Sequence, residues 1–76
     1  MEELVAWVAR GLVDEPGAVR VERVVAGETV LLRLHVAPDD IARVIGRQGR
    51  IVRALRTVVR AASTRDERVT LEIADS

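Results

Sequence analysis

Residues 46–49 are the part of the sequence whose types and spacing could bind a phosphate backbone. Gly46 and Gly49 enclose Arg47 and Gln48, and apolar residues precede and follow these four positions. Glycine has no Cβ, so its backbone can approach a phosphate closely and can adopt conformations that other residues resist. A helix that begins after the second glycine would add unpaired N–H groups and the positive end of its dipole. We therefore predict that this segment holds the backbone of a nucleic acid.

Basic charge is concentrated around this segment, although the net charge of the 76-residue chain is zero. Residues 41–65 contain seven arginines and no acidic residue, whereas residues 1–40 contain four arginines and eight acids. A basic segment on an otherwise acidic chain is the electrostatic footprint of a protein that binds a polyanion. The alternative interpretation is a helix with a solvated arginine face.

The composition argues against several other kinds of site. The chain has no cysteine, which excludes disulfides and a thiolate zinc site, and its single histidine, His35, cannot form a metal centre without carboxylates. No paired carboxylates lie near residues 46–49, no Ser-His-Asp set is evident, and the Gly-Lys-Ser/Thr end of a P-loop is missing. We therefore expect no enzyme, no metal and no cofactor.

The N-terminus and the hydropathy bear on location. No apolar run approaches the roughly 18 residues that a membrane-spanning helix needs, and the chain opens with Glu2 and Glu3 where a signal peptide would be basic. We expect a cytoplasmic protein that does not enter a membrane.

The first half of the chain is predicted to form one helix and a hairpin. Apolar residues recur at helical spacing from Glu2 to Val13, and Trp7 is expected in the core, with a subunit contact as the alternative. Alternating residues then predict a strand over 19–25, with a slip at 23–25 that indicates a bulge or a frayed end. A second strand covers 30–36, and its outward face carries a solvated histidine.

The second half supplies the elements that hold the glycine segment. A short helix starts at Pro38 and ends at Gly46, and a longer one runs from Gly49 or Arg50 to about Ala62. A polar link over 63–67 leads to a last strand over 68–74. The fold class is therefore α+β, with a three-stranded mixed sheet covered on one face by three helices. If the strands over 30–36 and 68–74 are neighbours, they should pair in parallel.

This arrangement resembles a KH domain of type II, whose elements follow the order αββααβ. The run from Ile45 to Val52 matches the apolar-Gly-x-x-Gly-x-x-apolar motif, and the element order matches over essentially the whole chain, so residues 1–76 are expected to form a single KH domain. The chain length, the Val-Ala-Pro-Asp-Asp lead-in at 36–40 and the run at 44–51 look most like KhpA, a family of small stand-alone bacterial KH proteins.

The resemblance implies binding of about four single-stranded RNA nucleotides, with the backbone on the loop and the bases in an adjacent apolar groove. The strand over 30–36, with Ile41 and Val44, would help to border the groove, and Arg56 and Arg60 are expected to lie far from the loop. The predicted RNA-binding residues are Gly46, Arg47, Gln48, Gly49, Arg50, Arg43, Arg53, Ile45 and Val52.

The resemblance also implies partners. The chain has no Phe or Tyr, so it has little means to stack bases, and one copy should bind RNA weakly and with mild sequence preference. The family suggests a homodimer or a complex with a KhpB-like RNA-binding protein, and a role as an RNA chaperone or post-transcriptional regulator. The two candidate dimer surfaces are the first helix and the region of the glycine loop with its two helices. The alternative function is a protein-interaction module on a KH fold with little RNA affinity of its own.

Overall fold

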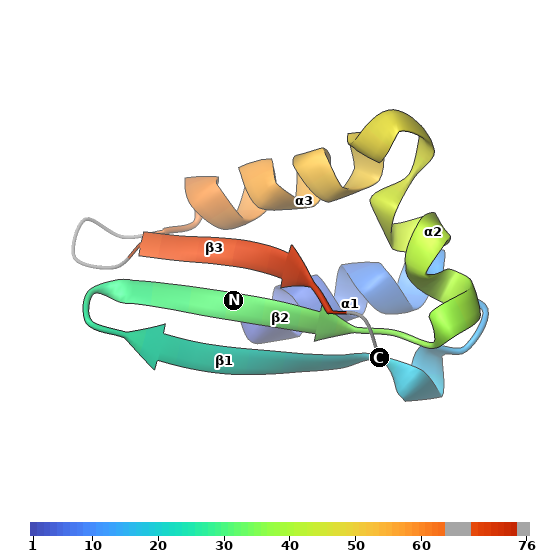
Figure 1. Ribbon diagram of the computed structural model, residues 1–76, viewed down its shortest axis with the longest axis horizontal. Coiled ribbons are helices and arrows are strands. Elements are labelled where there is room, and N and C mark those ends of the chain that lie inside the picture. The colour runs from blue at the N-terminus through green and yellow to red at the C-terminus, as the bar shows by residue number, and fades with distance from the viewer. Residues whose placement is uncertain (64–67, 75–76) are drawn as a thin grey trace.

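The computed structural model describes residues 1–63 and 68–74, which form three α-helices around one mixed sheet (Figure 1). The order αββααβ confirms the prediction from sequence, while the predicted link at 64–67 lies outside the described residues. The elements are α1 (Glu2–Leu12), β1 (Arg20–Ala26), β2 (Thr29–His35), α2 (Ile41–Ile45), α3 (Arg50–Ala61) and β3 (Arg68–Ile73), with single 3-10 turns at Pro16–Ala18, Pro38–Asp40 and Arg47–Gly49.

The sheet has the order β1-β2-β3, so β2 is central and both other strands are edges. β1 pairs with β2 in antiparallel orientation, and β2 pairs with β3 in parallel, as predicted. Two parallel neighbours need a long crossover connection. That crossover contains α2, the glycine loop and α3, so the loop joins two helices that belong to one packed unit (Figure 1).

The core lies between the sheet and the helices because alternate residues of β2 point to the same side. Leu32 and Leu34 have no exposed surface, and Val44 of α2 is equally buried. The other buried members of this cluster are Val5 and Ala9 of α1, Leu55 and Val59 of α3, Val69 and Leu71 of β3, and Val19, Val30 and Val36.

The predicted bulge in the first strand is wrong. β1 is continuous and pairs residue by residue with β2, from Arg20 opposite His35 to Ala26 opposite Thr29. The apolar pattern slips because Arg23 occupies a position on the helix-covered side of an edge strand. There its Nη1 lies 3.1 Å from Oε1 of Glu2 in α1, so a charge replaces an apolar contact without any change of register.

The prediction that Trp7 lies in the core is also wrong, because 72% of its surface is exposed. Helix α1 turns Val5 and Ala9 toward the sheet, and these two small residues fill the available space completely. Trp7 lies about 160° away from Val5 around the helix axis, given about 100° per residue, so it points to the opposite side.

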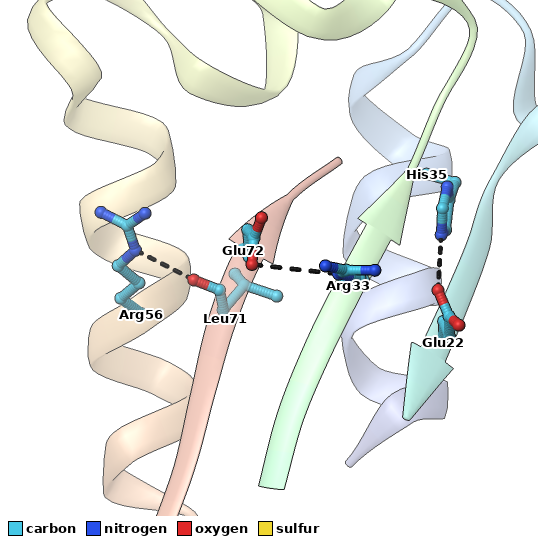
Figure 2. Close-up of polar contacts among 6 residues, drawn as sticks. All are labelled: Glu22, Arg33, His35, Arg56, Leu71 and Glu72. Atoms are coloured by element: carbon cyan, nitrogen blue, oxygen red, sulfur yellow. Dashed lines mark hydrogen bonds and ion pairs between the residues drawn. The ribbon is translucent and has the colours of Figure 1, made fainter. Parts of the chain in front are cut away.

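The uncovered face of the sheet is polar. His35 lies there as predicted, half-buried, with its Nε2 3.2 Å from Oε1 of Glu22, and Arg33 Nε lies 3.9 Å from Oε2 of Glu72 (Figure 2). This face therefore lacks the apolar surface that the helix-covered face supplies. Among the described residues no helix has the length and apolar character required to span a bilayer.

Candidate nucleic-acid interface

The glycine loop is a single turn held by its own backbone. Helix α2 ends where the Gly46 N–H donates to the Ala42 carbonyl at 2.9 Å, and the Gly49 N–H donates to the Gly46 carbonyl at 3.1 Å. Gly46, Gln48 and Gly49 all have positive φ, at 77°, 58° and 73°. Helix α3 then starts at Arg50 without a side-chain cap, so its first N–H groups have no side-chain acceptor.

The two glycines are needed for different reasons. A Cβ on Gly46 would lie 2.6 Å from Cγ1 of Ile51, and its φ of 77° with ψ of 171° is a conformation that only glycine adopts readily. A Cβ on Gly49 would have no neighbour closer than 3.9 Å, so only its left-handed backbone favours glycine. Gly46 therefore sets how closely the loop packs on α3, in addition to any approach to a ligand.

Three of the arginines of α3 lie on the side of the helix toward β3. At about 100° per residue, Arg53, Arg56 and Arg60 share one side of the helix, next to the buried arc of Val52, Leu55 and Val59. That buried arc packs on the sheet, and the arginine side therefore follows the outer edge of β3 (Figure 1). Arg56 and Arg60 are predicted to lie far from the loop because they are distant from it in sequence. That prediction does not include β3, the strand beside the helix, and so it misses their position along this edge.

A groove between α3 and β3 follows from this packing. Its cavity is about 290 Å³, with Arg56 and Arg60 on the helix side and Val69, Thr70 and Leu71 on the strand side. Arg56 Nε donates to the Leu71 carbonyl at 3.2 Å (Figure 2). Residue 56 lies about 10 Å along the helix axis from Gly49, so the groove begins about two helical turns beyond the loop.

The open edge of β3 provides polar backbone groups along the groove. Arg68 N–H donates to the Glu28 carbonyl and Ala74 N–H donates to the Leu34 carbonyl, so these residues turn their backbone toward β2. The alternate residues Val69, Leu71 and Ile73 turn theirs outward, because N–H and C=O groups alternate in direction along a strand. The groove can therefore offer hydrogen bonds to the edges of bases.

Arg43 lies in a different environment from the arginines of α3. Its Nη2 is 2.9 Å from Oδ2 of Asp14, and its Nε is 3.3 Å from Oδ1 of Asp40. Asp40 is only 2% exposed and also accepts from the backbone N–H groups of Asp14 and Glu15, each at 3.1 Å. The carboxylate and Arg43 together fix α2 to the connection that follows α1.

Comparison with known proteins shows the family of the chain. The family model described as "KhpA/KhpB, KH domain" matches residues 2–73. The chain belongs to this family of KH domains. Proteins named "RNA-binding protein KhpA" from Clostridium perfringens and Halalkalibacterium halodurans are each 47% identical to it, over 96% and 99% of this chain and 99% and 100% of theirs. The protein of that name from Treponema pallidum is 47% identical over 97% of this chain and 94% of its own. No solved structure matches the chain.

Two of the residues predicted to bind RNA in this KH domain are apolar. Ile45 is half-buried at the end of α2, whereas Val52 is only 7% exposed and packs inward from α3. Parts of the strand over 30–36 are predicted to border the groove, and its residues Val30, Leu32, Leu34 and Val36 are at most 3% exposed. The strand next to the KH loop's second helix is β3, since β2 is central in the sheet.

A second groove of this KH domain lies between α1 and α3 and is almost wholly apolar. Its volume is about 320 Å³, and Arg50 at one end is its only charged lining residue among those described. Leu4 and Val58 on its rim are 40% and 45% exposed, and Trp7 is on the same helix as Leu4. The full lining is Leu4, Val5, Val8, Leu12, Arg50, Ile51, Ala54, Leu55, Val58 and Val59.

Proposed function

We propose that this KH domain binds single-stranded RNA, with the backbone on residues 46–49 and the bases in the groove between α3 and β3. The observation that carries the proposal is that one helix, α3, begins at the glycine turn and also forms the arginine wall of a groove whose other wall is an open strand edge. Phosphates need positive charge, whereas bases need hydrogen-bond partners and apolar surface, and this surface has all of these. The relatives named as RNA-binding proteins support the same choice.

The charged residues with no partner are the best candidates for phosphate contacts. Among the described residues none forms a hydrogen bond or ion pair with the side chain of Arg47, Arg50 or Arg60. Arg43, in contrast, is already paired with two acids and would have to exchange them for phosphate. Gly46, Gln48 and Gly49 contribute backbone, and Ile45 contributes apolar surface beside the loop. Val52 supports the groove from within.

The apolar groove between α1 and α3 is a poor site for bases. It offers almost no donors or acceptors, and an unpaired base edge in such a groove would lose its hydrogen bonds to water. The RNA surface is therefore placed on the β3 side of α3.

RNA binding is tested with an oligonucleotide at two salt concentrations. The double variant Arg47→Asp with Gln48→Asp should weaken binding at least about tenfold, and wild-type affinity should fall as salt rises. The matched control is Arg10→Asp with Thr29→Asp, which changes net charge equally at two exposed positions on α1 and β2. Equal binding by wild type and the loop variant would refute the proposal, and equal losses in both variants would reduce it to non-specific attraction.

We also propose a second function, which is association through α1 and α3. An exposed Trp7 favours it, because a large exposed aromatic residue is typical of an interface anchor, and Trp7 lines a shallow pocket that shares Val8 and Leu12 with the apolar groove. We propose a second copy of this chain as the partner, or a KhpB-like RNA-binding protein in its place. Two linked RNA sites would gain avidity over one weak site, which suits an RNA chaperone or post-transcriptional regulator.

Sedimentation tests this association with and without RNA. The Trp7→Ser variant should weaken self-association by about thirtyfold, which is the loss expected from one strong anchor residue. Val24→Ser is the control, because Val24 is also exposed but lies on the opposite, helix-free face of the sheet. A monomer at every concentration, or an unchanged dimer in Trp7→Ser, would contradict this role for the surface. A stable dimer that does not bind RNA would favour the interaction-module alternative.

A further inference from the structure

Arg53 binds the glycine loop itself. Its Nε donates to the Gly49 carbonyl at 3.3 Å, and its Nη2 donates to the Gln48 carbonyl. One planar guanidinium therefore holds two successive carbonyl oxygens, in the fork-like geometry that arginine can supply and lysine cannot. Arg53 is also among the residues predicted from the sequence to contact RNA.

The two carbonyls belong to the least favourable part of the loop backbone. Gln48 has φ 58° and ψ 24°, and Gly49 has φ 73° and ψ 17°, so two successive residues are left-handed. Glycine adopts this conformation readily, but a residue with a Cβ such as Gln48 does so at a free-energy cost. A contact that favours the conformation of Gln48 is therefore needed if the loop is to keep one shape.

The same peptide groups are held at their other ends by the loop. The Gly49 N–H donates to the Gly46 carbonyl at 3.1 Å, and the Arg50 N–H donates to the Arg47 carbonyl. The two peptide units between residues 48 and 50 thus have both their N–H and their C=O groups hydrogen-bonded. The loop backbone accepts from the N–H groups, and the Arg53 side chain donates to the C=O groups. The Gly49 carbonyl, at the N-cap of α3, also accepts the first intrahelical bond, so the Gln48 carbonyl is the one that depends on the Arg53 side chain.

We propose that Arg53 is a positioning residue, which holds the carbonyls of Gln48 and Gly49 so that the loop has its binding shape before RNA arrives. This inference depends on the proposed RNA function only for its effect on affinity. It divides the arginine side of α3 into two roles. Arg53 acts through the loop backbone, whereas Arg60, seven residues along the same side and without a partner among the described residues, is available to a phosphate.

The decisive variant is Arg53→Lys, because lysine keeps the charge and loses the two-point contact. Lysine binds phosphate well as a point charge, so a direct phosphate contact would survive this change. A positioning contact would not, and we expect RNA affinity to fall by about fivefold to tenfold while the dependence on salt stays the same. Arg20→Lys, at an exposed position of β1 on the opposite edge of the sheet from β3, is the matched control and should leave affinity within about twofold of wild type.

Amide hydrogen exchange in the RNA-free protein gives a second readout. The amides of Gly49 and Arg50 should exchange about tenfold faster in Arg53→Lys than in wild type, and should be unchanged in Arg20→Lys. Unchanged exchange in Arg53→Lys, or full RNA affinity in that variant, would overturn the proposal. Because exchange needs no RNA, a wild-type protein that fails to bind RNA would refute the proposed function and still leave this test decisive.

Discussion

Helix α3 has two sides that face different neighbours. One side carries arginines along the open edge of β3, and the other carries Ile51, Ala54 and Val58 toward α1. The first side offers charge and backbone hydrogen-bonding groups, and the second offers apolar surface with very few polar groups. The difference shows that the basic segment of the sequence is not a uniformly basic surface, since the helix separates its charge from its apolar residues around the axis.

The two sides should respond differently to perturbation. Contacts with phosphate depend on salt and on arginine, whereas contacts between apolar surfaces depend on area and shape. The glycine loop joins α2 to α3, and Asp40 joins α2 to the connection after α1, so changes at either place should affect the fold that supports both sides. The following predictions use these differences.

The largest effect is expected from Gly46→Ala. The new Cβ would meet Ile51, and the backbone conformation is unfavourable for alanine, so unfolding free energy should fall by about 3 kcal/mol. Ile51 also lines the α1–α3 groove, so both RNA binding and association should weaken. Urea denaturation measures the change.

Gly49→Ala is the control for this prediction. Its Cβ would have space, so only the left-handed backbone should cost free energy, about 1 kcal/mol. Equal losses of stability in the two variants would show that contact with Ile51 is unimportant.

Removal of the Asp40 carboxylate should have the next largest effect. Asp40→Ala leaves the Asp14 and Glu15 N–H groups and Arg43 without their buried acceptor, and should destabilise the fold by about 2 kcal/mol. Asp39→Ala, at an exposed neighbouring position, should change stability by less than about 0.5 kcal/mol. If the Asp40→Ala and Asp39→Ala variants unfold at the same temperature, the Asp40 carboxylate does not join α2 to the segment after α1.

Salt should separate the two surfaces without any mutation. If about three phosphates are neutralised, a rise from about 50 to about 200 mM salt should weaken RNA binding by about twentyfold. Self-association through α1 and α3 should change little over the same range, because the groove has one charged lining residue among those described. Fluorescence anisotropy and sedimentation at matched salt measure the two. A parallel fall in both would mean that charge also controls association.

The smallest effect is expected from Arg60→Gln. Loss of one phosphate contact should reduce the slope of log affinity against log salt by about 0.7, with a decrease of only a few fold in affinity. Arg20→Gln, at an exposed position of β1 on the other side of the sheet, should leave the slope unchanged. A slope that does not change in Arg60→Gln would place RNA away from the α3–β3 groove.

Local patterns predicted the elements well, because periodicity and turn residues depend on neighbours in sequence. The alternation from Val30 to Val36 places its inward residues in the core, and Gly46 ends α2 as expected. The prediction of burial failed where burial depends on which distant segment packs against a residue. Trp7 was placed in the core because it is large and apolar, but Val5 and Ala9 already occupy the space between α1 and the sheet.

The candidate site was predicted in part for the same reason. The loop and its neighbouring arginines are consecutive in sequence and could be recognised, whereas the strand beside them comes from β3, after α3 in the chain. Only the sheet order shows that β3 is the edge next to α3, and that Arg56 and Arg60 lie along it. Asp14, which forms an ion pair with Arg43, is likewise distant from it in the sequence.

The sequence by itself determined the order of elements, the position of the glycine turn and the concentration of arginine around it, because each of these depends on residue type and short-range spacing. The tertiary structure decided which arginine binds a backbone carbonyl, which binds an acid and which has no partner among the described residues, and it left Trp7 exposed. The physical reason is that periodicity shows which residues share a side of a helix, whereas the packing of distant segments decides what that side meets.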